Sequence, residues 1–232
     1  MEKLLRAGFA ALGLPLDETA LARFQTYYTL LDERSKVMNL TAIHGETDVA
    51  QLHFLDSAAL LTVEPLAGKS VIDIGTGAGF PGVPLAIFLP EAKVTLLDSS
   101  EKKTDFIRET CTALGIPVQV VCGRSEELAR REDFFQAFDI AVARAVARLN
   151  ILLELCAPYV RMGGRFLAYK GASAEEEVAE AASAAKRLGM ELEAVVAAGP
   201  ASTAHKIAVY RRVGETPPAF PRKYAKIKKA PL

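Results

Sequence analysis

The chain has 232 residues, half of them hydrophobic and 24% charged, which is the composition of an ordinary globular protein with a sizeable core. Its three cysteines are widely separated, which argues against a disulfide framework or a zinc site and suits a reducing compartment. No apolar run approaches the roughly 18 residues of a membrane span, and the N-terminal stretch lacks the pattern of a signal peptide. We therefore expect a cytoplasmic protein, with neither a metal site nor a membrane partner.

The formal net charge is zero, but the charge is unevenly distributed along the chain. Residues 1–67 carry five basic and nine acidic side chains, whereas residues 205–232 carry eight basic side chains and one acid, Glu215. A basic end indicates an acidic partner such as nucleic acid, but a solvated tail has the same composition. Charge alone does not decide between the two.

Residues 1–62 show helical periodicity and no strand pattern. Apolar residues recur at helical spacing in residues 4–12, again in 21–31 after a break at Leu14-Pro15, and again in 49–60. Asp17 is expected to cap the second of these helices. The pattern predicts a helical N-terminal segment, residues 1–66, packed on the remainder of the protein.

From residue 70, short β-type runs alternate with helix-like stretches. This alternation predicts right-handed βαβ crossovers and a mostly parallel sheet with helices on both faces, within residues 67–213. From Gly214 the chain has no core-forming period, so residues 214–232 are predicted to form a basic tail. The expected strands are Ser70–Ile74, Lys93–Leu97, Val118–Cys122, Asp139–Ala143, Arg165–Tyr169, Leu192–Val196 and His205–Val213. The expected helices between them are Pro84–Leu89, Glu101–Leu114, Ser125–Arg131, Leu149–Val160 and Ala174–Leu188.

A glycine-rich segment, Asp73–Gly79 (DIGTGAG), follows the first expected strand and precedes a helix. Glycines here allow a tight turn and let the backbone approach a ligand. The pattern alone does not separate S-adenosylmethionine from a nicotinamide dinucleotide. Two details favour S-adenosylmethionine. The Asp73 carboxylate would repel a pyrophosphate, and Pro81 and Pro84 lack the backbone donors that a phosphate site uses.

Polar groups also follow the next two strands. Asp98 stands at the distance from Gly75 where a carboxylate accepts the ribose hydroxyls of an adenosine cofactor, in dehydrogenases as well. The segment Gly123–Glu126 follows the third strand, at the same edge of the sheet. Each acid alone is equally well explained as a helix N-cap. Acids placed after successive strands favour a cofactor site on an α/β, Rossmann-like fold.

With these residues, the chain resembles the bacterial 16S ribosomal RNA guanine-N7 methyltransferase family, also called glucose-inhibited division protein B. The resemblance covers nearly the whole chain and implies a class I methyltransferase fold. It also implies S-adenosylmethionine as cofactor, and as substrate one guanine in a loop of small-subunit ribosomal RNA near the decoding centre. The motifs that carry it are Asn39–Thr41, His53–Ser57, Asp73–Gly82, Leu97–Ser99, Ala143–Ala145 and Lys170-Gly171.

The resemblance also implies which residues hold the cofactor. The implied contacts are Gly75, Phe80, Asp98, Ser99, Ser100, Ser125, Glu126 and Arg144, with Gly77 added from the same glycine loop. The implied partner is 16S ribosomal RNA or the small ribosomal subunit, and we expect a monomer. The family tail has a glycine and an inner proline that this chain lacks, so the conformation of residues 221–232 stays open.

Guanine N7 carries no proton, so its methylation is an in-line attack on the sulfonium methyl that needs no general base. We therefore nominate no catalytic acid, base or nucleophile, and expect alignment to supply most of the acceleration. Arg144 is expected to hold the methionine carboxylate or guanine O6, or else to pair with an acid at the sheet edge. His53 and Asp56 lie on one helix face, where an RNA pocket and a structural pair are equally consistent. Lys170 is a candidate phosphate contact.

The basic tail is expected to add salt-sensitive affinity for RNA, so deleting residues 221–232 should weaken RNA binding and leave cofactor binding intact. Three other functions stay open: methylation of a protein or small molecule, a nicotinamide-dependent oxidation, and RNA binding without catalysis. The tail cations are Arg222, Lys223, Lys226, Lys228 and Lys229.

Overall fold

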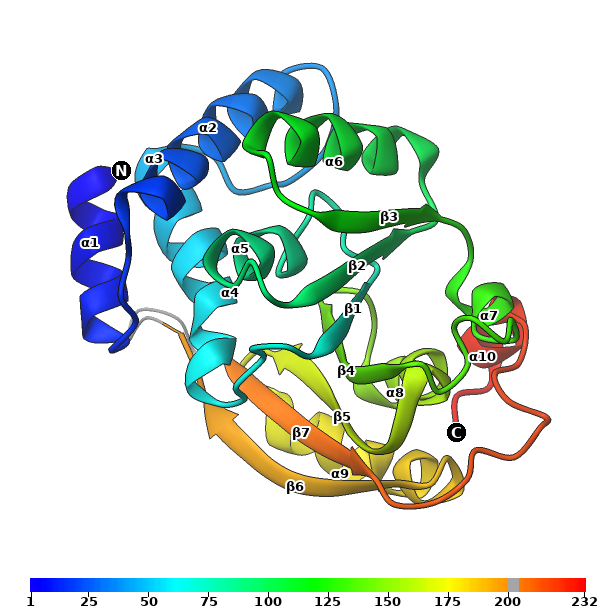
Figure 1. Cartoon of the computed structure of the whole chain (residues 1–232). Coiled ribbons are helices and arrows are strands. Elements are labelled where there is room, and N and C mark those ends of the chain that lie inside the picture. The colour runs from blue at the N-terminus through cyan, green and yellow to red at the C-terminus, as the bar shows by residue number, and fades with distance from the viewer. Residues whose placement is uncertain (200–204) are drawn as a thin grey trace.

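A single seven-stranded sheet organises the part of the chain that the computed structural model describes, residues 1–199 and 205–232 (Figure 1). The strand order is β3-β2-β1-β4-β5-β7-β6. The first five strands pair in parallel, and β7 is antiparallel to both β5 and β6, so the prediction of a mostly parallel sheet is confirmed. The predicted core range includes residues 200–204, which lie outside the described residues. The strands are β1 (Ser70–Ile74), β2 (Lys93–Asp98), β3 (Val118–Cys122), β4 (Phe138–Arg144), β5 (Val160–Lys170), β6 (Met190–Ala197) and β7 (Lys206–Arg212).

Helices cover both faces of this sheet because its strands are apolar on both sides. Successive strand residues face opposite ways: Val71 packs in the cluster with the helices that follow β1 and β2, and Ile72 packs with those that follow β4 and β5. The helices of the first face are α5 (Gly82–Phe88) and α6 (Glu101–Leu114), and those of the second are α8 (Leu149–Cys156) and α9 (Ala174–Arg187). The short α7 (Ser125–Leu128) follows β3.

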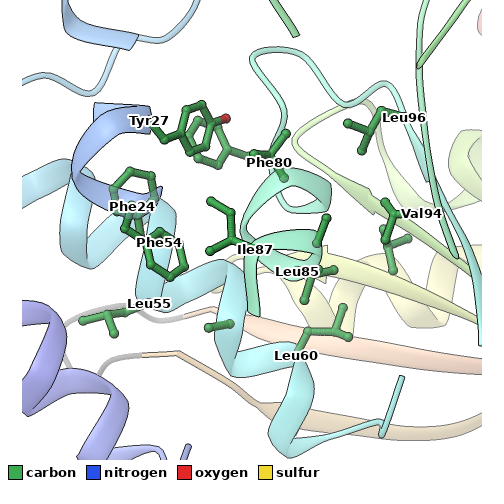
Figure 2. Packing of buried hydrophobic residues seen from close by; sticks show 14 of the residues in the cluster. Phe24, Tyr27, Phe54, Leu55, Leu60, Phe80, Leu85, Ile87, Val94 and Leu96 are labelled. Carbon is green, nitrogen blue, oxygen red and sulfur yellow. The ribbon is translucent and has the colours of Figure 1, made fainter. Parts of the chain in front are cut away.

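The N-terminal helices extend the first of these two clusters. α1 (Glu2–Ala11) and α2 (Glu18–Ser35) are followed by one helical run, composed of α3 (Glu46–Val49), a π-helical stretch (Ala50–Leu55), α4 (Asp56–Ala58) and a 3-10 turn (Ala59–Thr62). Asp17 caps α2 as predicted, since its Oδ1 accepts a hydrogen bond from the Ala20 backbone N–H at 2.6 Å. Figure 2 shows Tyr27 and Phe54 beside Phe80, with Phe24 packed on Phe54. The Tyr27 hydroxyl donates to the Ala78 carbonyl at 2.6 Å, so these helices contact the glycine loop directly.

The C-terminal segment, residues 214–232, was expected to form a basic tail outside the core, and in the structure it packs on the core. It ends in α10 (Tyr224–Lys229), which lies beside α7 in Figure 1, and it buries Phe220 and Ile227 in the second cluster. Arg222 donates from Nε and Nη2 to the fully buried Glu154 carboxylate of α8, at 2.8 and 2.5 Å. Two apolar residues and one ion pair anchor this segment. The expectation was wrong because these residues are too far apart in the sequence to form a period.

Candidate functional site

The glycine loop and the ends of the first four strands enclose a cavity of about 500 Å³ at the carboxyl edge of the sheet. This is the edge where ligands bind in open α/β folds. Of the predicted cofactor contacts, only Ser100 does not line the cavity; its backbone N–H instead donates to Asp98 Oδ1 at 2.9 Å. The predicted residues that line it are Gly75, Gly77, Phe80, Asp98, Ser99, Ser125, Glu126 and Arg144.

Asp73 bonds to both ends of the glycine loop and does not line the cavity. Its fully buried Oδ2 accepts hydrogen bonds from Thr76 Oγ1 at 2.7 Å and from the Gly82 N–H at 2.8 Å, which ties the start of the loop to the start of α5. Burial raises the pKa of Asp73 to about 6 against the lowering effect of these two donors. These two bonds fix the conformation of the glycine loop.

Glycine is required in the loop for two different reasons. Gly75 has φ +72°, and a Cβ there would lie 2.7 Å from Val146 Cγ2, so the loop packs closely on the segment after β4. Gly77 has φ +63°, but a Cβ there would meet nothing closer than 4.0 Å. The space above Gly77 belongs to the cavity, and a bound group can approach this backbone closely.

Asp98 joins the loop to the end of β2. Its Oδ2 accepts from the Gly77 N–H at 2.9 Å, and the carboxylate lines the cavity while remaining only 8% exposed. Each carboxylate oxygen holds one backbone N–H and has a further lone pair for a ligand hydroxyl. The acceptor oxygens of Asp98 and the open space above Gly77 thus fit the ribose of S-adenosylmethionine, and the individual contacts stay predictions.

Arg144 stands at the end of β4, at the centre of a buried polar cluster. Its Nη1 donates to Asp56 Oδ2 at 2.8 Å and to the Leu52 carbonyl at 3.2 Å, and Nη2 lies 3.0 Å from His53 Nδ1. Asp56 is fully buried, and its Oδ1 also bonds to His205 Nδ1 at 2.6 Å. Arg144 is therefore ion-paired, but with an acid of α4 and not with one at the sheet edge.

His53 lies between this cluster and the cofactor cavity. Its ring stacks on Phe80 with 4.1 Å between centroids, and its Nε2 lies 2.8 Å from Thr41 Oγ1. Burial, aided by the charge of Arg144, lowers the pKa of His53 to about 3. His53 is therefore neutral at physiological pH. It belongs to a π-helical stretch, a geometry that is common at functional sites.

A second cavity of about 280 Å³ adjoins the first, and both are lined by His53, Arg144 and Ala145. Lys170 lines this second cavity, but its Nζ donates to the Ala147 carbonyl at 2.8 Å and to Glu177 Oε2 at 2.9 Å. The expectation that Lys170 contacts a phosphate is thus corrected, because the ammonium is buried and paired with a carboxylate.

Two residues of the site were missed by sequence reasoning. His205 was expected only as the first residue of a strand, and it pairs with Asp56 across 149 positions. Tyr224 was assigned to the tail, and it lines the cofactor cavity. Neither residue lies in a local pattern that points to the site, because both reach it through the tertiary fold.

The family model for rRNA small subunit methyltransferase G matches residues 20–205. The chain belongs to this family. A ribosomal RNA small subunit methyltransferase G from Pelotomaculum thermopropionicum is 41% identical, with 100% of this chain and 99% of the relative covered. The protein of the same name from Caldanaerobacter subterraneus subsp. tengcongensis is 43% identical, with 99% and 98% covered. The resemblance inferred from the motifs is confirmed.

Solved structures show the same fold in methyltransferases. A SAM-dependent methyltransferase from Aquifex aeolicus matches with a TM-score of 0.56 and 20% identity, covering 81% of this chain and 97% of that one. A SAM-dependent O-methyltransferase from Thermotoga maritima gives 0.53 and 20%, covering 80% and 72%. The family match confirms the predicted class of enzyme and, together with this fold, the cofactor S-adenosylmethionine. That decides against the oxidoreductase and against RNA binding without catalysis.

None of the helices within residues 1–199 and 205–232 combines the length and the apolar composition that a membrane span needs. Within the same residues, no group of three or more His, Cys, Asp or Glu side chains is arranged to hold a metal ion. Cys111, Cys122 and Cys156 are free thiols.

Proposed function

We propose that this protein transfers the methyl group of S-adenosylmethionine to N7 of one guanine in a loop of 16S ribosomal RNA near the decoding centre. The relatives named ribosomal RNA small subunit methyltransferase G support ribosomal RNA as the substrate. The observation that carries the proposal is the second cavity, because it shares a wall of His53, Arg144 and Ala145 with the cofactor cavity and so offers room for an acceptor base beside the cofactor. Whether free RNA or the assembled small subunit is methylated is part of the test below.

Methyl transfer to N7 requires alignment of the two reacting atoms and no proton transfer. When bound, S-adenosylmethionine supplies an electrophilic methyl group on a sulfonium. The N7 lone pair forms the new C–N bond as the C–S bond breaks, and the positive charge passes from sulfur to the purine, with no proton lost. The adjoining cavities would hold the two atoms in line, and effective molarities of ~10⁵–10⁸ M set the scale of such positioning.

The buried cluster fits a base that becomes cationic. Asp56 neutralises Arg144, and His53 is uncharged because its pKa is lowered to about 3. The second cavity, called the acceptor cavity from here on, therefore presents Arg144 donors for guanine O6 while Asp56 balances the charge of Arg144. His53 and Arg144 are assigned to positioning the acceptor, and no residue is assigned as an acid, a base or a nucleophile.

RNA must present the guanine unstacked, as for other enzymes that modify bases. Cations exposed on the C-terminal segment supply sequence-independent affinity for the backbone. Arg222 does not contribute to this affinity, because its guanidinium is paired with the buried Glu154. Deleting residues 221–232 is likewise a poor test, because the deletion would also uncover the core. The cations that remain exposed are Lys223, Lys226, Lys228 and Lys229.

The protein is proposed to act as a cytoplasmic monomer. The large apolar side chains exposed in the described residues, such as Val37, Phe135 and Met162, belong to separate elements. Scattered apolar side chains do not form the contiguous patch that a stable dimer interface uses. Sedimentation of the purified protein at micromolar concentration tests this, and a dimer would refute it.

The decisive experiment incubates the protein with labelled S-adenosylmethionine and, in separate samples, deproteinised 16S RNA, small ribosomal subunits and total protein. Chemical cleavage at 7-methylguanosine should then map one labelled guanine in the RNA of one of the first two samples. Label on another atom of the RNA would overturn the N7 assignment. Label only in the protein sample would overturn RNA as the substrate.

A further inference from the structure

The order of the strands fixes which end of the cofactor lies where along the cavity. The acceptor cavity is lined by the ends of β4 and β5, at Arg144 and Lys170, so the transferred methyl group is expected at the β4 end of the cofactor cavity. Asp98, the expected ribose acceptor, follows β2, and the cavity continues to Gly123–Glu126 after β3. Because β3 lies outside β2 in the sheet, the adenine base of a bound cofactor would extend toward Arg124 and α7. This placement rests on the confirmed cofactor and not on the choice of RNA substrate.

The C-terminal segment reaches this same end of the cavity. The Tyr224 backbone N–H donates to Glu126 Oε1 at 3.3 Å, and the guanidinium of Arg124 lies over the Tyr224 ring, 4.9 Å from its centroid. All three residues line the cavity. Figure 1 shows α10 against α7, although residues 124 and 224 are far apart in sequence.

This contact is held in place by two hydrogen bonds that precede it in the chain and by a buried side chain that follows it. Arg130 Nη2 donates to the Pro221 carbonyl at 2.7 Å, and the Arg222 N–H donates to Glu154 Oε1 at 2.8 Å. Ile227, one turn after Tyr224, is fully buried. The position of the Tyr224 ring is thus determined by the packed core, as a binding residue requires, and not by a free chain end.

We propose that Tyr224 is a cofactor-binding residue: together with Arg124 it forms the stacking surface for the adenine base of S-adenosylmethionine. A planar purine stacks favourably on an aromatic ring or on a guanidinium. The C-terminal segment is then a wall of the cofactor site, in addition to carrying exposed lysines.

Calorimetric titration with S-adenosylhomocysteine, without RNA, tests the proposal through binding alone. Tyr224→Ala should raise the Kd about fivefold or more, the lower end of what stacking one base contributes. Tyr224→Phe should bind like the wild type. Tyr224→Leu fills similar space without a π face, so it should bind as weakly as Tyr224→Ala. The matched control is Tyr28→Ala on α2, which removes a tyrosine that does not line the cavity and should leave the Kd within twofold.

The outcomes separate stacking from packing. A wild-type Kd for Tyr224→Leu would show that the ring only fills space and would overturn the proposal, as would a Kd within twofold for Tyr224→Ala. Urea unfolding of each variant checks the fold, and if Tyr224→Ala unfolds, the comparison of Phe with Leu still decides. Because RNA is absent, a failure here leaves the proposed methylation of guanine N7 untouched, and a failure of that proposal leaves this one untouched.

Discussion

Replacing Arg222 with alanine tests whether the C-terminal segment belongs to the folded core. Glu154 is fully buried on α8, and the Arg222 guanidinium supplies bonds at 2.8, 3.1 and 2.5 Å to its carboxylate. Removing one partner of a buried ion pair costs ~3–5 kcal/mol because the other charge is left unpaired. The Arg222 backbone N–H would keep its 2.8 Å bond to Glu154. We therefore expect the lower end, a loss of about 3 kcal/mol in the free energy of unfolding.

Urea unfolding followed by circular dichroism measures this loss from the shift of the midpoint at unchanged slope. Lys223→Ala, an exposed neighbour, should change the free energy of unfolding by no more than about 0.5 kcal/mol. The double variant Glu154→Leu with Arg222→Met removes both charges and should recover most of the stability. A loss below about 1 kcal/mol for Arg222→Ala would refute the reasoning and restore the picture of a solvated tail.

Three further results are expected. The first concerns the exposed lysines Lys223, Lys226, Lys228 and Lys229, replaced by glutamine. The magnitude of the slope of log K for RNA binding against log salt concentration should fall by about 0.7–0.9 for each phosphate that is no longer neutralised. An unchanged slope would place the RNA elsewhere. In urea unfolding, Gly75→Ala should destabilise the protein by at least about 1 kcal/mol more than Gly68→Ala. Both glycines have positive φ, but only a Cβ at Gly75 would meet Val146. Equal losses of stability would contradict the packing argument. Between pH 7 and pH 5 the wild type should lose about 1–2 kcal/mol of stability relative to His53→Gln. The folded pKa of His53, about 3, lies below the unfolded value, so this stability is present above pH 6.5 and is lost as the pH falls; parallel curves would show that His53 is not held neutral.

The elements and the cofactor loop were predictable because their signals are local. β1, β3 and α6 have the bounds that the apolar runs predict, and Asp17 caps α2 as its position suggests. The run Asp73–Gly82 placed the loop between a strand and a helix, with glycine where the backbone takes positive φ. Alternation of strands and helices was enough to predict a mostly parallel sheet, since such connections admit few topologies.

Some strand limits needed the sheet itself. β5 begins at Val160 and not at Arg165, because Val160 pairs with Phe138 across a register shift in β4. The residues before Arg165 include Gly163 and Gly164, which a strand pattern disfavours. Pairing with a neighbouring strand offsets that preference, and this pairing cannot be seen in a single sequence.

Only the tertiary structure decided what the charged residues do. Arg144 meets Asp56 across 88 positions, and Arg222 meets Glu154 across 68, so no local period links the partners. Composition therefore gave the same expectation, a free cation, for Arg222 and for the exposed Lys223. The fold separates the two, because a charge carried into the interior must find a partner while a charge at the surface keeps its water.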